Sequence, residues 1–351
     1  MALYGSFIVK SVDYTPHETK WIPSSARFVS CGITPRSKGI LKVFELSNGE
    51  LKTTVDCPEL LSHGIKCATF GASRVEERNV AVGDYKGGLS VFNLERCDNA
   101  SGDKAKPIFA VQAHNSMVNA IDGIGGTSLG CGAPEIVTGG RDGCVRVWDT
   151  RVNHAVVCFE PEKGTSPRDC WAVCFGNSYN DEERCVCAGF DNGDVKLFDL
   201  RMNALTWESN CKNGITGVQF DRPDIEMNKL LITSLESKFR CYDMRTQHEK
   251  DGFSFLSERA HRSTIWLGKH LPQNRDLFMT GGGNGGFNMY KYHYPMNRVG
   301  KHKEDQSPIG VVGNVELLNS RVISTQPISS FDWSPDRAGL CCLSCFDQTV
   351  R

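Results

Sequence analysis

The sequence has almost no net charge and no long apolar run. Its 351 residues carry 40 Lys and Arg against 41 Asp and Glu, which gives a formal net charge of −1. A chain without excess positive charge has no overall field to attract a phosphate backbone, so we expect no nucleic-acid binding. No apolar stretch approaches the ~18 residues of a transmembrane helix, so we expect no membrane partner.

A secretion signal is also missing from the start, MALYGSFIVK, which has no basic segment followed by an apolar one. We therefore expect the 16 cysteines to be reduced, mostly buried thiols of a cytoplasmic protein. Cys342 and Cys345 have CxxC spacing, but no second pair accompanies them at zinc-ribbon spacing. We expect no metal site and no cofactor.

An internal repeat organises the chain. Each copy has an apolar stretch, a turn rich in Gly and Asp, and a strand-like segment that ends in an aromatic residue; the clearest is EIVTGGRDGCVRVWDTR (135–151). Seven copies align, and the first six have the anchors Phe44, Phe92, Trp148, Phe198, Tyr242 and Tyr290. Their spacings of 44 to 56 residues lie at or above the ~40–45 of the WD40 repeat. No stripe of helical period competes with this pattern.

The repeats predict an all-β fold, a single seven-bladed WD40 β-propeller over residues 1–351. We expect the segment 7–12 to be the outer strand of the last blade, because this closes the ring and removes an exposed sheet edge. The predicted blades span approximately 13–55, 65–111, 117–160, 170–208, 215–256, 264–318, and 328–351 together with 7–12. The connection 295–324 is the longest, and we interpret its charged run KHKED as a solvated loop and VVGNVELL (311–318) as the outer strand of blade six.

The third copy contains a structural relay of four side chains: His114, Thr138, Asp142 and Trp148. In WD40 repeats these residue types connect an inter-blade loop to the indole of the third strand by hydrogen bonds, so that buried N–H groups find partners. A His and an Asp side by side also suggest catalysis. Nothing else in the sequence supplies a nucleophile with a convergent acid and base, so we expect no enzyme.

One face of the predicted propeller collects large apolar side chains. When the first strands of the blades are aligned, the face-pointing positions are His17, Lys66, Asn119, Trp171, Thr216, Trp266 and Ser329. The residues before the turn acids add Arg141, Phe190, Leu235 and Phe346. Because exposed aromatic and apolar clusters mark interaction sites, our partner-binding candidates are Trp171, Phe190, Leu235, Trp266 and Arg141.

Three copies end in an aromatic-Asp-x-Arg box, with Arg151, Arg201 and Arg245 as the arginines. This box resembles the one in substrate receptors of Cullin-4 RING ubiquitin ligases, where the arginine faces the adaptor. An alternative function is therefore a ligase substrate receptor that binds its adaptor through these arginines.

Several segments resemble one particular WD-repeat family. They include RDCWAVCFGNSYNDEERCVCAGFDNGDVKLFDLR (168–201), MNKLLITSLESKFRCYDMRTQH (227–248) and STQPISSFDWSPD (324–336). These resemble the family of WD-repeat dynein axonemal assembly factors, from about residue 21 to the end of the sequence. Loop strings such as NAIDGIGG (119–126), which the fold does not require, are shared too.

The resemblance implies a non-enzymatic adaptor of the cytoplasm. It implies as partners a RuvB-like and prefoldin-like co-chaperone complex and axonemal dynein heavy chains, whose assembly before transport into cilia such proteins support. A link to apoptosis is also attached to the family. We expect a monomeric propeller.

Overall fold

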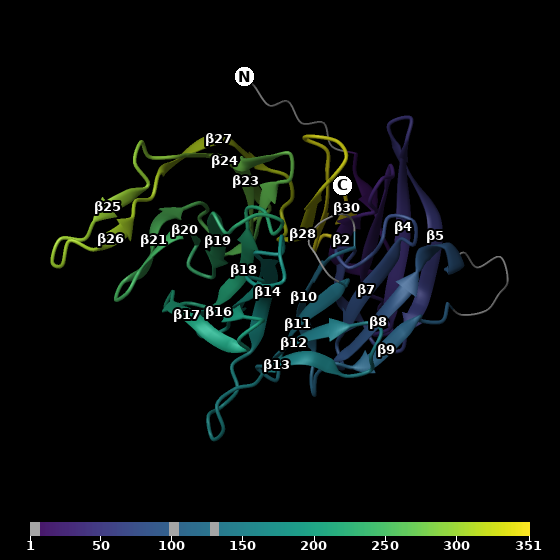
Figure 1. Ribbon diagram of the computed structural model, residues 1–351. Coiled ribbons are helices and arrows are strands. Elements are labelled where there is room, and N and C mark those ends of the chain that lie inside the picture. Colours follow the sequence, from purple (N-terminus) through teal and green to yellow (C-terminus); the bar gives the residue numbers. More distant parts are fainter. Residues whose placement is uncertain (1–7, 98–104, 127–132) are drawn as a thin grey trace.

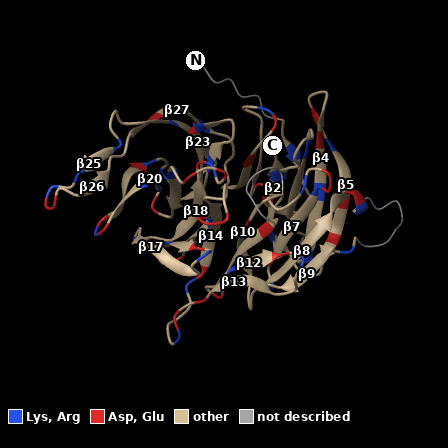
Figure 2. Cartoon of the chain, in the orientation of Figure 1, with Lys and Arg blue, Asp and Glu red and all other residues tan. Residues whose placement is uncertain are grey.

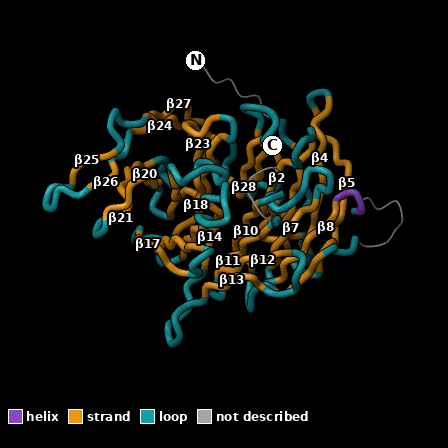
Figure 3. The backbone as a smooth tube through the Cα atoms, in the orientation of Figure 1, coloured by secondary structure: helices purple, strands orange, loops and turns teal. Residues whose placement is uncertain are grey.

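Seven four-stranded antiparallel sheets are arranged in a ring in the computed structural model, which describes residues 8–97, 105–126 and 133–351 (Figure 1). The predicted all-β, seven-bladed propeller is confirmed. Within the described ranges the one helix is the 3-10 turn η1 (Leu94–Arg96), drawn in purple in Figure 3. No helix in those ranges is long and apolar enough to cross a membrane.

Each sheet runs from an inner strand at the central channel to an outer strand at the rim. Blades one to three contain β2 (Thr15–Trp21), β3 (Arg27–Ile33), β4 (Gly39–Ser47), β5 (Glu50–Leu61); β6 (Ile65–Thr69), β7 (Asn79–Asp84), β8 (Gly88–Asn93), β9 (Phe109–Gln112); β10 (Val118–Ile124), β11 (Glu135–Gly140), β12 (Val145–Asp149) and β13 (Ala155–Phe159). Blades four and five contain β14 (Cys170–Gly176), β15 (Cys185–Phe190), β16 (Asp194–Asp199), β17 (Ala204–Asn210); β18 (Ile215–Phe220), β19 (Lys229–Ser234), β20 (Lys238–His248) and β21 (Gly252–Arg259). Blades six and seven contain β22 (Ile265–Leu271), β23 (Asn274–Gly282), β24 (Gly286–His293), β27 (Asn314–Val322); β28 (Ile328–Trp333), β29 (Cys341–Cys345), β30 (Thr349–Val350) and β1 (Lys10–Ser11).

The core lies between neighbouring blades. The second strand of a blade is covered on both faces by neighbouring blades, so its sequence is a continuous apolar run and not an alternation of apolar and polar residues. Every residue of β15 is buried, for example, whereas the outer strand β17 is mostly exposed. One cluster joins Ala172 and Leu197 of blade four to Tyr242 and Phe253 of blade five. Contacts of this kind between adjacent sheets hold the ring together.

Glycine makes the tight turns between the second and third strands possible. Gly143, Gly193 and Gly285 have φ values of 78°, 91° and 71°, which other residues rarely adopt. At Gly285 a Cβ atom would also lie 1.9 Å from the carbonyl oxygen of Ser324. Positive φ therefore favours glycine at these three turns, and close approach adds to this at Gly285, whereas Ser237 and Gln348 adopt a positive φ in the turns of blades five and seven.

The ring closes as predicted. β1 pairs antiparallel with β30, Lys10 opposite Val350, and so completes blade seven. Phe7, the first residue of the predicted closing segment, lies outside the described residues. Blade seven is also tied to blade one, because the backbone N–H of Trp21 donates to Asp332 Oδ2 at 2.9 Å.

The long connection of blade six differs from the expectation. The outer strand β27 begins at Asn314, not at residue 311, and the connection contains a small hairpin of β25 (Val299–Lys301) and β26 (Pro308–Gly310). This hairpin projects sideways and packs against β20 and β21 of blade five (Figure 1). Arg298 anchors it, because its guanidinium lies 2.6 Å from the fully buried Asp243 carboxylate.

Candidate functional site: the mouth of the central channel

The inner strands all begin at one face of the ring, called here the narrow face, and the turns between second and third strands lie beside them. The seven positions that the strand alignment predicted to point there line one cavity of about 390 Å³ at the mouth of the channel. They are His17, Lys66, Asn119, Trp171, Thr216, Trp266 and Ser329. Their placement is therefore confirmed, one residue from each blade.

Apolar side chains dominate the part of the mouth that blades four to six form. Trp266 is 41% exposed and Leu235 36% exposed, while Trp171 is half-buried. Trp171 and Leu235 converge above Gly214, where an added Cβ would lie 2.7 Å from Trp171 Cζ3 and 3.2 Å from Leu235 Cδ1. Phe346 adds a 39% exposed ring from blade seven. The patch is thus contiguous with the channel opening.

The expectation that Phe190 lies on this face is wrong. Phe190 is the last residue of β15, is buried at 7% exposure, and packs in the core between blades three and four. The turn of blade four is made by Asn192, whose Oδ1 accepts from the Asp194 N–H as Asp142 accepts from Cys144 in blade three. The alignment therefore slipped by one residue, and a slip of one reverses the side on which a strand residue lies.

Arg141 does lie on the narrow face. Its side chain is 62% exposed, and its Nε is 3.6 Å from Asp169. It follows β11 directly, and its backbone N–H donates to the carbonyl of Met117 next to the inner strand. The same backbone contact is made in blades two, four, five, six and seven, by Tyr85, Asp191, Leu235, Gly283 and Phe346, so these residues are the structural equivalents of Arg141.

Charged groups inside the channel escaped the sequence reasoning. Lys20 Nζ lies 3.5 Å from Glu18 and 3.9 Å from Asp332. Although burial opposes it, these two carboxylates raise the pKa of Lys20. Burial, together with the charge of Lys20, lowers the pKa of nearby Lys269. The sequence did not predict this cluster, because the alternation of residues along one strand does not show that charged residues of different blades meet at the axis of the channel.

His17 is a neutral member of the mouth. Burial, together with the positive charge of Lys66, lowers its pKa to about 4. The hydroxyl of Tyr85 lies 2.9 Å from its Nε2, and its ring packs edge-on to Phe346 with centroids 6.1 Å apart. At neutral pH this histidine therefore contributes aromatic surface rather than charge.

The structural relay of blade three is formed as predicted. Trp148 Nε1–H donates to Thr138 Oγ1 at 2.9 Å, and Thr138 Oγ1 lies 2.8 Å from His114 Nε2. His114 Nδ1 lies 2.9 Å from Asp142 Oδ1. Although burial opposes it, the hydrogen bonds from His114 and from backbone N–H groups lower the pKa of Asp142. These contacts engage both ring nitrogens of His114, so a structural role accounts for the neighbouring His114 and Asp142.

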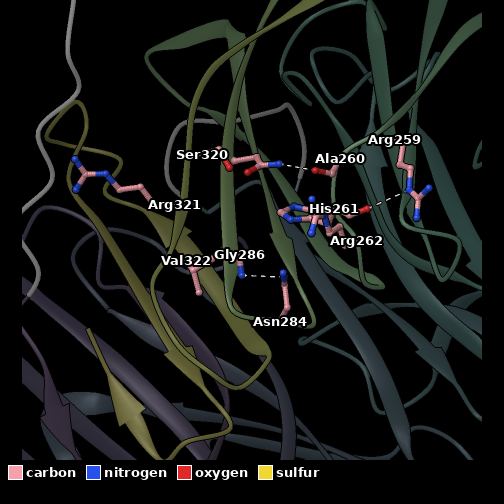
Figure 4. A pocket seen from close by; sticks show the side chains of 10 residues that line it. Arg259, Ala260, His261, Arg262, Asn284, Gly286, Ser320, Arg321 and Val322 are labelled. Atoms are coloured by element: carbon pink, nitrogen blue, oxygen red, sulfur yellow. Dashed lines mark hydrogen bonds between the residues drawn. The ribbon is translucent and has the colours of Figure 1, made fainter.

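Blade six carries a reduced relay at the edge of a shallow pocket (Figure 4). His261 Nε2 lies 2.8 Å from Thr280 Oγ1, but Asn284 replaces the acid and its Oδ1 accepts from Gly286 N–H. Asn288 donates to the carbonyl of Ala260 at 2.6 Å. The pocket wall also includes Arg259 and Arg262, which give it positive charge.

The three boxes lie at the opposite end of the third strands, on the wide face. In each, the Asp accepts from the backbone N–H of its Arg, at 2.9 Å for Arg151, 2.8 Å for Arg201 and 2.9 Å for Arg245. Arg151 also pairs with its own Asp149, and Arg245 pairs with Glu226. Turn capping thus accounts for the Asp of each box, and the ion pair with Asp149 also accounts for Arg151.

Comparison with known proteins gives concordant results. The model of the WD domain, G-beta repeat, matches residues 105–149. The chain is 52% identical over 345 residues to dynein axonemal assembly factor 10 of Homo sapiens, covering 98% of this chain and 94% of that protein. It is 50% identical over 344 residues to the protein of that name from Chlamydomonas reinhardtii, covering 97% and 93%. The chain belongs to the dynein axonemal assembly factor 10 family. A more distant relative of that name, from Dictyostelium discoideum, is 25% identical over 372 residues.

In this family member one histidine cluster resembles a metal site. Atoms of His248, His302 and Asp305 lie within 4.8 Å of one another, where the blade six hairpin meets blade five. However, His248 Nδ1 accepts from the backbone N–H of Asp251 at 3.0 Å, so its Nε2 carries the proton, which it donates to Ser307 Oγ at 2.8 Å. That tautomer offers no lone pair to a metal beside Asp305. The cluster therefore acts as a clamp between two blades, and His302 is not part of a freely solvated loop.

Proposed function

We propose that this protein is a non-enzymatic scaffold that supports the assembly of axonemal dynein heavy chains in the cytoplasm. The observation that carries the proposal is the 52% identity, over 98% of this chain, to a protein named dynein axonemal assembly factor 10. Similarity of fold alone would not support it, because propellers serve many functions.

A rigid ring with two distinct faces suits a scaffold. Its inner strands are fixed by contacts between all neighbouring blades, so side chains at the mouth are held in place without a partner. We assign the partner site to the narrow face, with Trp171, Leu235 and Trp266 as apolar anchors and Arg141 as a polar neighbour. Anchors of this type carry most of the binding energy at protein interfaces.

The partners in this proposal are those that the sequence resemblance implies: a RuvB-like and prefoldin-like co-chaperone complex, and the dynein heavy chains. The protein acts as a monomer that contacts a co-chaperone subunit and a dynein chain on different surfaces. No step of the proposal requires a cofactor.

A tagged pull-down from cells building motile cilia, read by mass spectrometry, tests the proposal. We expect co-chaperone subunits and dynein heavy chains with the wild-type protein. The double variant Trp171→Ala/Trp266→Ala should lose a partner, because truncation of a true anchor costs about 2 kcal/mol or more. The control Arg151→Ala/Arg201→Ala alters the wide face and should capture both. Wild-type capture by the tryptophan variant, with an unchanged circular dichroism spectrum, would refute this site; Cullin-4 and its adaptor in place of dynein would refute the function.

A further inference from the structure

The narrow face is basic although the chain as a whole is neutral. Positive and negative residues are mixed over the described part of the chain, as Figure 2 shows. The loops that lead into the inner strands and the turns between second and third strands hold seven exposed Lys and Arg against four exposed Asp and Glu. The basic residues are Arg36, Lys86, Arg141, Lys163, Arg168, Lys212 and Arg262.

Partners inside the protein cancel the acids of this face but not its bases. Three of the four exposed acids are ion-paired: Asp13 with Lys42 at 2.9 Å, Glu160 with Arg146 at 3.9 Å and Glu236 with Lys238 at 3.9 Å. Of the seven exposed bases, Arg141 has an ion-pair partner, while the other six have none among the residues that the structure describes. The face therefore carries an unbalanced positive charge.

The turn acids Asp84, which is buried, and Asp142 and Asp347, which are half-buried, do not restore the balance. Asp84 Oδ1 accepts the backbone N–H groups of Lys86 and Gly88, at 2.7 and 2.8 Å. Asp142 belongs to the structural relay, and Asp347 accepts from Ser324 and pairs with Arg351. These three carboxylates are satisfied by their own turns, whereas Asp191 in the turn of blade four keeps an Oδ1 without a hydrogen-bond partner among the described residues and offsets one of the basic residues.

The basic rim encloses the apolar mouth. Trp171, Trp266 and Phe346 come from three different blades and line one cavity of about 390 Å³, with Lys66 in the same wall. Arg259 and Arg262 line the shallow pocket of blade six in Figure 4. Apolar anchoring at the centre and positive charge around it are thus combined on one surface.

We infer that the narrow face binds an extended, acidic segment of a partner polypeptide, which inserts one large aromatic or aliphatic side chain into the mouth. This inference rests on the proposed function, because it gives the chemistry of the partner at the same face. Attraction between the acidic segment and the basic residues around the mouth aligns the segment on the face and increases the association rate. The inserted side chain supplies most of the affinity.

The geometry favours a peptide over a single-stranded nucleic acid. A nucleic-acid strand needs a row of aromatic platforms along a basic groove, on which successive bases stack. Here the aromatic side chains Trp171, Trp266 and Phe346 surround a single opening of about 390 Å³ instead of forming a row. The positive residues are arranged around that opening instead of along a line.

A selection experiment tests the inference. The folded protein is immobilised and a phage-displayed library of peptides, each with one fixed tryptophan and random flanking residues, is selected on it. The same library is selected on Trp171→Ala/Trp266→Ala for subtraction. We expect the recovered peptides to be enriched in Asp and Glu. Their affinity should decrease when the NaCl concentration is raised from about 0.05 M to about 0.5 M, because salt screens the attraction between opposite charges.

Matched variants assign the binding to the face. Each tryptophan truncation should weaken the best peptide about thirtyfold. Lys66→Gln and Arg262→Gln should each weaken it about threefold at low salt, as exposed ion pairs do. The control Arg201→Gln removes an exposed charge of the wide face and should change nothing.

Recovery of neutral or basic peptides, or no enrichment over the tryptophan variant, would overturn the inference, as would tighter binding of a single-stranded oligonucleotide. Failure here is distinguishable from failure of the proposed function. If the pull-down still captures both the co-chaperone subunits and the dynein chains with Lys66→Gln/Arg168→Gln/Arg262→Gln at the wild-type level, the acidic-segment inference fails and the function stands. If the wild-type chain captures no dynein chains, the function itself fails.

Discussion

Removal of one buried hydroxyl should reveal how much the relay of blade three stabilises the ring. Thr138 is fully buried, and its Oγ1 contacts both Trp148 Nε1 and His114 Nε2, which are themselves almost completely buried. The substitution Thr138→Val keeps the shape of the side chain and removes both hydrogen bonds. It leaves one donor and one acceptor without a partner in a site closed to water.

The magnitude follows from the number of groups left unpaired. Each unsatisfied buried polar group costs about 1–3 kcal/mol, so Thr138→Val, which leaves two such groups, should lower the free energy of unfolding by about 2–6 kcal/mol. Blade six provides a matched control, because Thr280 contacts His261 but its blade has Tyr290 in place of the tryptophan. Thr280→Val leaves one group unpaired and should cost about half as much.

Urea unfolding at neutral pH, followed by tryptophan fluorescence and circular dichroism, measures both variants. The midpoints should fall in the order wild type, Thr280→Val, Thr138→Val, with an unchanged denaturant slope. In a Trp148→Phe background the Thr138→Val cost should shrink, because the indole donor is already absent. Equal midpoints for the two valine variants, or a loss below about 0.5 kcal/mol for Thr138→Val, would refute the reasoning.

Two further predictions concern buried charge. His270 is buried, both its ring nitrogens lack a hydrogen-bond partner among the described residues, and burial lowers its pKa to about 4. Because the unfolded chain takes up a proton near pH 6.5 and the folded chain does not until about pH 4, stability should fall as the pH drops through this window, by about 2 kcal/mol at about pH 5 for this residue. Melting curves of His270→Phe should show a shallower loss between pH 7 and 5, and an identical pH profile would exclude this residue as a cause. Separately, Arg298→Ala removes the ion pair to Asp243 and should raise amide hydrogen exchange in 299–310 at least about tenfold, because undocked segments open at low cost. Unchanged exchange there would mean that other contacts of the hairpin are sufficient.

Local chemistry explains why the fold was predictable from the sequence. The turn glycines, the aromatic anchors and the four relay side chains each leave a signal at fixed spacing, and together these predict seven blades closed by the segment before Thr15. The face-pointing positions followed from the same alignment, since alternation along an inner strand determines which residues reach the mouth. For Trp171 and Trp266 this placement is confirmed, and their role in binding stays a proposal.

The features that were missed depend on partners far along the chain. Asp191 and Asn192 can both serve as a turn acceptor, and only the structure distinguishes them, so Phe190 was placed on the wrong side. The docking of the blade six hairpin depends on Arg298 meeting Asp243 in blade five, which no local spacing indicates. Lys20 and Asp332 meet because the first and last blades are neighbours in the closed ring.

The central claim is that this protein supports dynein assembly through its narrow face. The most direct measurement is the amount of dynein heavy chain in flagellar axonemes of Chlamydomonas reinhardtii cells that lack their own relative and express this chain. We predict that the wild-type chain and Arg151→Ala/Arg201→Ala restore the heavy chains, while Trp171→Ala/Trp266→Ala, expressed at the same level, does not. Full restoration by the tryptophan variant would contradict the assignment of the face, and no restoration by the soluble, folded wild-type chain would contradict the function.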